Sequence, residues 1–296
     1  MKLAVHANYF LDEYGVQDGM KRIRDLGYRY ISYSITGRYD EPFVTQWSEE
    51  DLKNYFTPIR EAAQANGITI AYTHLKGDYY NDFSPHTFEA RKKMCHRAVL
   101  ATHYLGVEML GVRPVALNVP DPNSMELSRR VCYEVFDLLT QAAAELGVRI
   151  AVINPNRIKT SYCYGNTIDE LKEICQHYDA PLIFDPLNAY FTHIPYRRFM
   201  QELKDRFFAF VMDDLEPLTR SRTVPMLGSV NYSVIFSEMY DMPEDLVVSV
   251  DASPILEKYK TFSEDKALED AVNQLLLDMG EEFIHTMQVR KEQSRV

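Results

Sequence analysis

ELGVRIAVIN, residues 145–154, ends a helical pattern at Gly147 and begins an apolar run directly after it. Three earlier segments have the same form, namely DLGYRYISYS (25–34), ANGITIAYTH (65–74) and YLGVEMLGVR (104–113), and the four glycines are spaced 40, 39 and 41 residues apart. A glycine directly after the last helical residue commonly closes a helix. The apolar runs are too short for helices and are typical of buried parallel strands. The repeat therefore predicts consecutive modules of helix, glycine, strand and loop.

Strands at both ends of the chain extend this pattern to eight. We expect the strands near residues 2–6, 29–34, 68–73, 107–112, 149–153, 181–184, 207–212 and 245–250. Helix starts are indicated by Ser48 before three acidic residues and by Thr167 with Glu170 as a capping box. The last helix is expected over 264–290, with a polar tail at 291–296.

Eight parallel strands with helical crossovers predict an α/β fold, a single (β/α)8 TIM barrel that spans residues 1–296 as one domain. An open, doubly wound sheet is the alternative architecture for such a chain. That sheet would carry a glycine-rich phosphate turn after its first strand. The segment found there, HANYFLDEYG (6–15), is not such a turn.

Composition limits the classes of function. Hydrophobic residues make up 46% and charged residues 25% of the chain, enough for a large core. The net charge of −11 argues against a nucleic-acid partner, and no apolar run approaches the ~20 residues of a membrane helix. No signal peptide is recognisable at the N-terminus, so we expect a cytosolic protein. The cysteines lack metal-binding spacing and are expected to be free thiols; they are Cys95, Cys132, Cys163 and Cys175.

TIM barrels place their chemistry at the carboxyl ends of the strands. In this chain almost every predicted strand ends in a polar or ionisable side chain, and a ring of such groups implies a polar ligand or water between them. The residues at these ends, in strand order, are His6 with Asn8, Tyr33, His74, Arg113, Asn154, Asp185 with Asn188, Asp213 with Asp214, and Ser249 or Asp251. Some of these residues are expected to pair with loop backbone rather than to contact a ligand.

Three further segments carry a resemblance to a known family. RIAVINPNR (149–157), PLIFDPLNAYF (181–191) and GSVNYSVIF (228–236), together with the glycine repeats, resemble the xylose-isomerase-like barrels. That group includes tagatose and psicose epimerases, hydroxypyruvate isomerase, inosose dehydratase and endonuclease IV. The resemblance covers nearly the whole chain, and it implies a sugar isomerase or epimerase.

The resemblance also implies a divalent-metal site, which this sequence has largely lost. In similar epimerases a Glu ends the fifth strand, a His stands on the seventh and a Glu ends the eighth. Here those positions are held by Asn154, Val211 and Ser249, so that Asp185 is the one surviving ligand position. Asn, Val and Ser are poor substitutes for anionic ligands of a hard cation. We therefore expect no metal cofactor; Mn, Mg or Zn would need a site rebuilt from His6, His74, Asp185 and Asp251.

Two hypotheses about function follow from the resemblance. In the first, the protein is an enzyme acting on a sugar, polyol or sugar acid, with His74 and Asp185 as acid and base. Arg113 either binds an anion or neutralises an acidic neighbour, and the other side chains position the substrate; they are His6, Asn8, Tyr33, Asn154, Asn188, Asp214 and Asp251. In the second, the protein is a non-catalytic relative that binds a sugar-like ligand or a partner.

Two further expectations concern partners. A nuclease related to endonuclease IV would need a multi-zinc cluster and a basic DNA-binding surface, and neither is apparent. Related barrels often form dimers or tetramers, so the resemblance implies a possible homo-oligomer.

Overall fold

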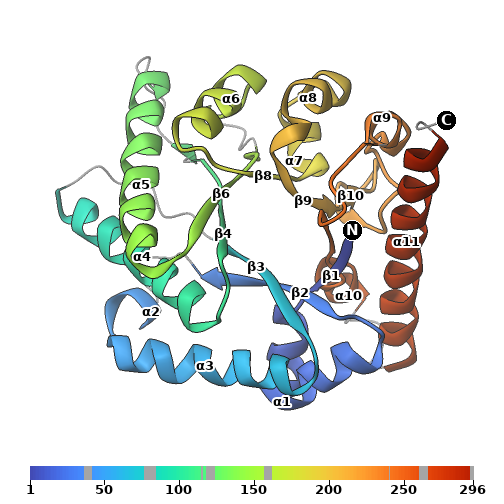
Figure 1. Cartoon of the computed structure of the whole chain (residues 1–296), viewed down its shortest axis with the longest axis horizontal. Coiled ribbons are helices and arrows are strands. Elements are labelled where there is room, and N and C mark those ends of the chain that lie inside the picture. Colours follow the sequence, from blue (N-terminus) through green and yellow to red (C-terminus); the bar gives the residue numbers. More distant parts are fainter. Residues whose placement is uncertain are drawn as a thin grey trace.

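A computed structural model describes residues 1–36, 42–76, 85–114, 116–117, 124–156, 162–239, 241–259 and 266–293. Its centre is a closed barrel of eight strands, every neighbouring pair of which is parallel. The order around the ring is β1-β12-β9-β8-β6-β4-β3-β2. Figure 1 shows the helices as an outer layer around these strands. The predicted TIM barrel is confirmed.

The barrel strands are β1 (Lys2–His6), β2 (Tyr30–Thr36), β3 (Thr69–Lys76), β4 (Met109–Val112), β6 (Arg149–Ile153), β8 (Leu182–Phe184), β9 (Phe207–Met212) and β12 (Val247–Val250). Two small antiparallel pairs lie outside the ring: β5 (Ala116–Leu117) with β7 (Tyr162–Cys163), and β10 (Asp214–Leu215) with β11 (Arg222–Thr223). Each of the eight strands overlaps its predicted range, with ends that differ by up to three residues.

The longer helices are α1 (Asn8–Asp25), α3 (Glu49–Ala65), α4 (Pro85–Tyr104), α5 (Ser124–Leu146), α6 (Ile168–His177) and α11 (Lys266–Gln293). Shorter helices are α2 (Pro42–Thr45), α7 (Pro186–Phe191), α8 (Tyr196–Leu203), α9 (Tyr232–Glu238) and α10 (Ser253–Tyr259), with a 3-10 turn at Lys204–Arg206. The last helix continues to Gln293, so the first half of the expected polar tail is helical and 294–296 lie outside the described residues.

Local signals in the sequence explain where the helices stop and start. The repeat glycines have left-handed backbone angles, with φ of 107°, 65°, 69° and 67° at Gly27, Gly67, Gly106 and Gly147. A side chain with a Cβ atom is strained in this conformation, which is why the repeat keeps glycine there. The predicted capping box of Thr167 with Glu170 is present, and the predicted helix start at Ser48 also forms a capping box, with Asp51. The predicted helix boundaries are confirmed at these positions.

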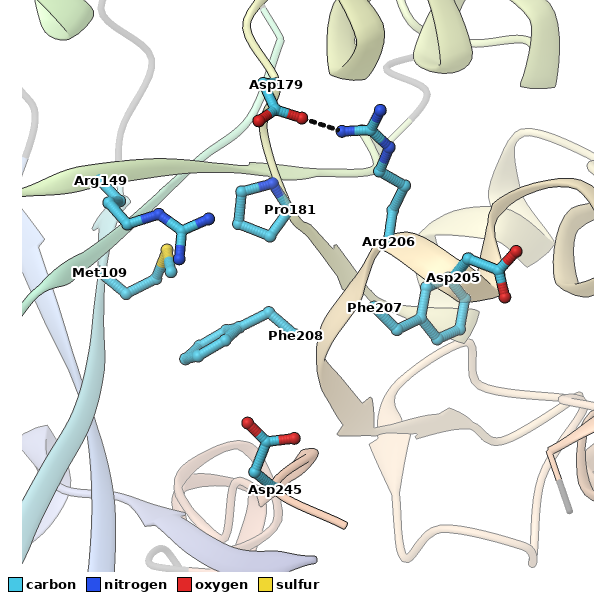
Figure 2. A pocket seen from close by; sticks show the side chains of 9 residues that line it. All are labelled: Met109, Arg149, Asp179, Pro181, Asp205, Arg206, Phe207, Phe208 and Asp245. Atoms are coloured by element: carbon cyan, nitrogen blue, oxygen red, sulfur yellow. Dashed lines mark hydrogen bonds and ion pairs between the residues drawn. The ribbon is translucent and has the colours of Figure 1, made fainter. Parts of the chain in front are cut away.

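The amino-terminal ends of the strands surround a hollow at one end of the barrel. Figure 2 shows its lining, with Arg149 and Phe208 on one side and Asp245 on the other. Asp179 and Arg206 form an ion pair there with a 2.8 Å separation between Oδ1 and Nη1. Catalytic sites of TIM barrels lie at the opposite end. We therefore interpret this end as structural.

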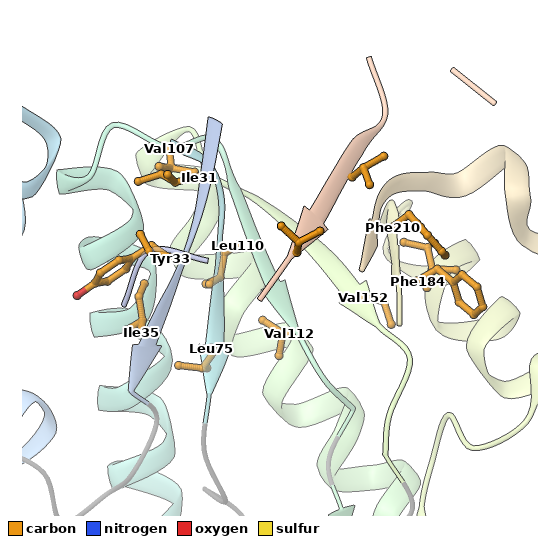
Figure 3. Packing of buried hydrophobic residues seen from close by; sticks show 14 of the residues in the cluster. Ile31, Tyr33, Ile35, Leu75, Val107, Leu110, Val112, Val152, Phe184 and Phe210 are labelled. Atoms are coloured by element: carbon orange, nitrogen blue, oxygen red, sulfur yellow. The ribbon is translucent and has the colours of Figure 1, made fainter. Parts of the chain in front are cut away.

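Strand alternation divides the apolar residues into two layers. One face of each strand packs against the helices, as Figure 3 shows for Ile31, Tyr33 and Ile35 of β2. The other face fills the barrel interior, where a separate cluster forms; its members are Ala4, Tyr72, Met109, Ala151, Ile153, Ile183, Ala209 and Val247. Successive strand residues point to opposite faces. Every second residue beyond the interior cluster therefore points toward the centre of the barrel mouth.

The first and last helices are joined through a buried glutamate. Glu269 of α11 accepts hydrogen bonds from the hydroxyls of Tyr9, at 3.1 Å, and Tyr14, at 2.5 Å. Arg22 Nε of α1 donates to the same carboxylate at 2.8 Å. A buried charge is costly unless it is paired and hydrogen-bonded, and this carboxylate has both kinds of partner. The contact ties the two ends of the chain together where the barrel closes.

Two expectations about the cellular setting concern the cysteines and the membrane. Within the described residues, the four cysteines are buried and form no disulfide. In the same part of the chain, no helix combines the length and the apolarity that crossing a bilayer requires. A cytosolic location and assembly into a homo-oligomer stay predictions.

We predict that Glu269→Ala destabilises the fold by about 2–3 kcal/mol, because it removes the carboxylate that accepts from Arg22 Nε and from the hydroxyls of Tyr9 and Tyr14. The free energy of unfolding from urea denaturation measures this loss. Asp25→Ala is the control, since its ion pair with Lys21 is exposed and should change stability by less than about 1 kcal/mol. An equal loss in both variants would contradict a closing role for Glu269.

Candidate functional site

The carboxyl ends of the barrel strands surround a second hollow, at the end where the polar ring was predicted. Residues from all eight barrel strands or the positions just after them line it, together with one side chain from the β10–β11 hairpin. The lining residues are His6, Ser32, Tyr72, His74, Arg113, Ile153, Ile183, Asp185, Val211, Asp213, Arg222, Ser249 and Asp251.

Three carboxylates and two guanidinium groups share this hollow. Asp185, Asp213 and Asp251 follow β8, β9 and β12, so they converge from three adjacent strands of the ring. Arg222 Nη1 lies 2.6 Å from Asp213 Oδ2 and forms a close ion pair. Arg113 follows β4, and its Nη2 lies 4.0 Å from Asp185 Oδ2. The two arginines therefore offset much of the negative charge of the three acids.

Asp213 is the carboxylate whose proton affinity is most changed by this setting. Burial raises its pKa from 3.8 to about 7, because the charged form loses its hydration. Arg222 opposes this rise, while the negative charges of Asp185 and Asp251 add to it. A group with a pKa near 7 is present in both protonation states at neutral pH, as a general acid or base must be.

Asp185 and Asp251 are each held in place by a neighbouring segment of backbone. Asp185 Oδ1 accepts from the Asn188 N–H at 3.0 Å and so caps the start of α7. Asp251 Oδ1 accepts from the Ser253 N–H at 3.0 Å and also from the Ser253 hydroxyl. These bonds fix the orientation of both carboxylates before any ligand binds.

A chain of hydrogen bonds connects serine hydroxyls and imidazoles on the other side of the hollow. Ser249 Oγ lies 3.2 Å from Ser32 Oγ, which in turn lies 3.2 Å from His6 Nδ1. His6 Nε2 is 3.0 Å from Ser34 Oγ, and the same hydroxyl is 2.9 Å from His74 Nε2. The rings of His6 and His74 are stacked with centroids 5.6 Å apart. This series of hydrogen bonds therefore fixes the position of His74, the predicted acid or base.

The asparagines predicted to bind sugar hydroxyls hold backbone instead. Asn154 accepts from the Asp185 N–H at 2.7 Å and donates to the Asp185 carbonyl at 2.8 Å. Asn8 makes the same pair of bonds with Ser34, at 2.7 and 3.0 Å. The Asn188 amide donates to the Asn154 carbonyl at 2.9 Å. None of the three is among the residues lining the hollow, so we revise their role from binding substrate to positioning Asp185 and Ser34.

Tyr33 and Asp214 also lie away from the hollow, because they occupy the wrong face of their strands. Tyr33 points toward the helices (Figure 3). It packs edge-on against Phe56, with ring centroids 6.3 Å apart. Asp214 is fully buried and accepts from the N–H groups of Leu215, Gly228 and Val230. It shapes the loop after β9, and the adjacent Asp213 takes the place in the site that Asp214 was expected to fill.

Four polar residues of this site were not predicted from the sequence. Arg222 comes from a hairpin in the loop after β9, and no repeat or motif marks it. Ser32 and Tyr72, which line the hollow, and Ser34, which links the two histidines, alternate with outward-facing residues. Strict period-two alternation along the second and third strands would have found these three. His6, His74, Arg113, Asp185 and Asp251 line the hollow as expected.

The donor set does not suit a divalent cation of the kind that the family resemblance implies. Within the described ranges no three His, Cys, Asp or Glu side chains are placed to hold a metal ion together. The Asp213 carboxylate is paired with Arg222, and both imidazoles are bonded to Ser34. Two fixed guanidinium charges in the same hollow also repel a further cation. The residues present therefore fit a network of guanidinium and carboxylate groups better than a metal centre.

Known proteins were compared with the chain as a whole. Residues 20–270 match the family model described as xylose isomerase-like TIM barrel. A comparison with curated proteins gave no significant match.

Solved structures of similar shape include the IolI protein with a bound zinc atom, at 18% identity and a TM-score of 0.70, covering 96% of this chain and 98% of that one. L-ribulose 3-epimerase has 11% identity and a TM-score of 0.71, covering 100% and 98%. D-psicose 3-epimerase from Clostridium cellulolyticum H10, with D-tagatose, has 14% identity and a TM-score of 0.66, covering 96% and 99%. At these identities the likeness establishes the fold alone.

We predict that Asp213 makes the stability of the protein depend on pH. The unfolded state releases this proton near pH 4, while the folded state keeps it to about pH 7. The folded state therefore binds more protons in this window, and stability should fall as pH rises from about 4 to about 7. The melting temperature of the wild type minus that of Asp213→Asn should decrease as pH rises over this range and then level off. Asp169→Asn, at an exposed position, is the control; a difference that does not change with pH would contradict the raised pKa.

Proposed function

Because the chain belongs to the xylose isomerase-like TIM barrel family, we propose that it is an enzyme of the sugar isomerase or epimerase type. Its reaction would move a proton on a carbon next to a carbonyl group of a sugar-like substrate. The observation that carries this proposal is the Asp213–Arg222 pair, which combines a carboxylate of pKa about 7 with a fixed positive charge in the same hollow.

The first step assigns the base. Asp213 accepts the proton from the carbon, the electron pair of the broken C–H bond forms a carbon–carbon double bond, and the π electron pair of the carbonyl moves to its oxygen. The enolate oxygen that forms carries negative charge, which Arg222 is placed to stabilise beside Asp213. Fixed charges aimed at a developing oxyanion are among the largest contributions to enzymatic rate.

The second step returns a proton to carbon, and His74 is the group proposed to deliver it. β3, which carries His74 at the mouth, lies four strands from β9 in the eight-strand ring and therefore opposite Asp213. A substrate between the two has an acid or base on each face. Delivery to the opposite face of the same carbon gives an epimer, and delivery to the neighbouring carbon gives an isomer.

The cation that the family resemblance implies has no role in these steps. Asp185 and Asp251 border the hollow on the strands beside Asp213, and they supply acceptors for substrate hydroxyls. The proposed substrate class is a sugar, polyol or sugar acid. The roles of His74 and Asp185 stay predictions, with Asp213 now added as the principal base.

A second candidate function is binding without turnover. Asn154, Val211 and Ser249 stand where the family resemblance implies metal ligands, and that loss favours a non-catalytic relative. The two candidates differ in one property: an enzyme of this type exchanges a carbon-bound hydrogen with solvent, while a binding protein does not.

We predict that the protein incorporates solvent deuterium at the carbon next to the carbonyl of a substrate. The measurement is proton NMR in D2O with aldoses, ketoses and their acids, on protein dialysed against a chelator. Asp213→Asn should slow exchange by about 100-fold or more, because it removes the base. Asp205→Asn, in the hollow at the other end of the barrel (Figure 2), should leave the rate unchanged.

Exchange that appears only after Mn²⁺ is added would contradict the metal-free assignment. Binding of a panel member with no exchange would favour the second candidate.

A further inference from the structure

The two arginines of the mouth differ in how their donors are used. Arg222 has a carboxylate oxygen 2.6 Å from Nη1. Arg113 has its nearest carboxylate oxygen, Asp185 Oδ2, at 4.0 Å from Nη2, which is beyond hydrogen-bond distance. Within the part of the chain that the structure describes, Arg113 Nε is buried and has no acceptor. Arg113 therefore presents a guanidinium whose Nε donor is not satisfied by the residues that the structure describes.

An unsatisfied buried donor destabilises a protein unless a ligand supplies the acceptor. The guanidinium of Arg113 lines the hollow, and its side chain is 37% exposed, so that a ligand can reach it. A planar fork of N–H groups matches the two oxygens of a carboxylate, which it binds through two parallel hydrogen bonds. The open donors thus point to a planar anion as the natural partner.

The charge balance of the hollow allows one such anion. Asp185 and Asp251 are balanced in number by Arg113 and Arg222, and the neighbouring His6, His74 and Tyr72 complete the titratable lining. Asp213, whose pKa is about 7, holds a proton much of the time at neutral pH. When Asp213 is protonated, the two remaining carboxylates and the two guanidinium groups sum to zero, so there is no net negative charge to repel a ligand with a single negative charge. A doubly charged phosphate group would be less well matched, because only one fork is open.

We propose that the substrate carries a carboxylate, which binds to the fork of Arg113, so that the protein acts on a sugar acid. The inference rests on the proposed function for the sugar part of the ligand and extends it by naming its anionic group. β4, which Arg113 follows, lies opposite β12 in the ring, while Asp213 and His74 belong to a different opposing pair, β9 and β3. The carboxylate would thus anchor one end of the substrate at Arg113, away from the Asp213–His74 pair between which the proton moves.

The test compares each neutral sugar with the acid that carries a carboxylate at carbon 6. Glucose with glucuronate, galactose with galacturonate, and fructose with fructuronate are titrated into chelator-treated protein, with affinity measured by calorimetry or thermal shift. At least one acid should bind about tenfold or more tightly than its neutral partner, as charge-assisted hydrogen bonds imply. Glucose 6-phosphate is included to separate a carboxylate site from a phosphate site.

Three variants assign the preference to a residue. Arg113→Met keeps the aliphatic stem and should weaken acid binding at least tenfold, while neutral sugars are unaffected. Arg113→Lys keeps the charge without the fork and should recover only part of the affinity. Arg149→Met removes the same charge in the hollow at the opposite end of the barrel and should change nothing (Figure 2).

Several outcomes would overturn the inference. These are equal affinity for acid and neutral sugar, tighter binding of the phosphate, no binding of any acid at millimolar concentration, or an equal effect of Arg113→Met and Arg149→Met. The proposed function fails independently: acids that bind through Arg113 without solvent exchange would refute turnover and leave this inference standing. Exchange on neutral sugars alone would refute this inference and leave the proposed function standing.

Discussion

Carboxylates that converge in a partly buried hollow repel one another, and a positive charge must be close to keep them ionised. At the mouth of this barrel Asp185, Asp213 and Asp251 come from three adjacent strands, so the requirement is built into the fold. Two guanidinium groups meet it, one in direct contact with Asp213 and one at a distance from Asp185. The difference between these two contacts underlies the whole account. The contact between Arg222 and Asp213 places a positive charge beside the proposed base. The longer separation between Arg113 and Asp185 leaves the Arg113 guanidinium able to donate to a ligand.

This arrangement depends on the alternation of side chains along parallel strands. The residues that fill the barrel interior and those that line its mouth lie on the same face, two positions apart, as with Ala209, Val211 and Asp213 of β9 and the position after it. The neighbouring Asp214 faces the other way and holds the loop that follows. One carboxylate thus faces the hollow, while the other holds the segment that forms the β10–β11 hairpin, which delivers Arg222. Adjacent residues of one strand end therefore have separate duties.

Much of the fold could be predicted because its signals are local. The glycines that end four helices and the apolar runs of the strands depend only on neighbouring residues, and all eight barrel strands overlap the ranges predicted from such runs. The site was predicted less completely. Asn154 and Tyr33 were chosen as strand-end residues without regard to the face on which they lie, and the structure shows both turned from the hollow. Arg222 reaches the site from a long loop, and no local pattern states where such a loop will fold.

The central claim is that guanidinium groups, and not a divalent ion, balance the carboxylates of the mouth. Anomalous scattering from a crystal soaked in Mn²⁺ and recorded at the manganese absorption edge tests this claim most directly. We expect no manganese peak among Asp185, Asp213 and Asp251, with Arg222 Nη1 still in contact with Asp213. A fully occupied peak that is bonded to these carboxylates, with Arg222 displaced, would contradict the account.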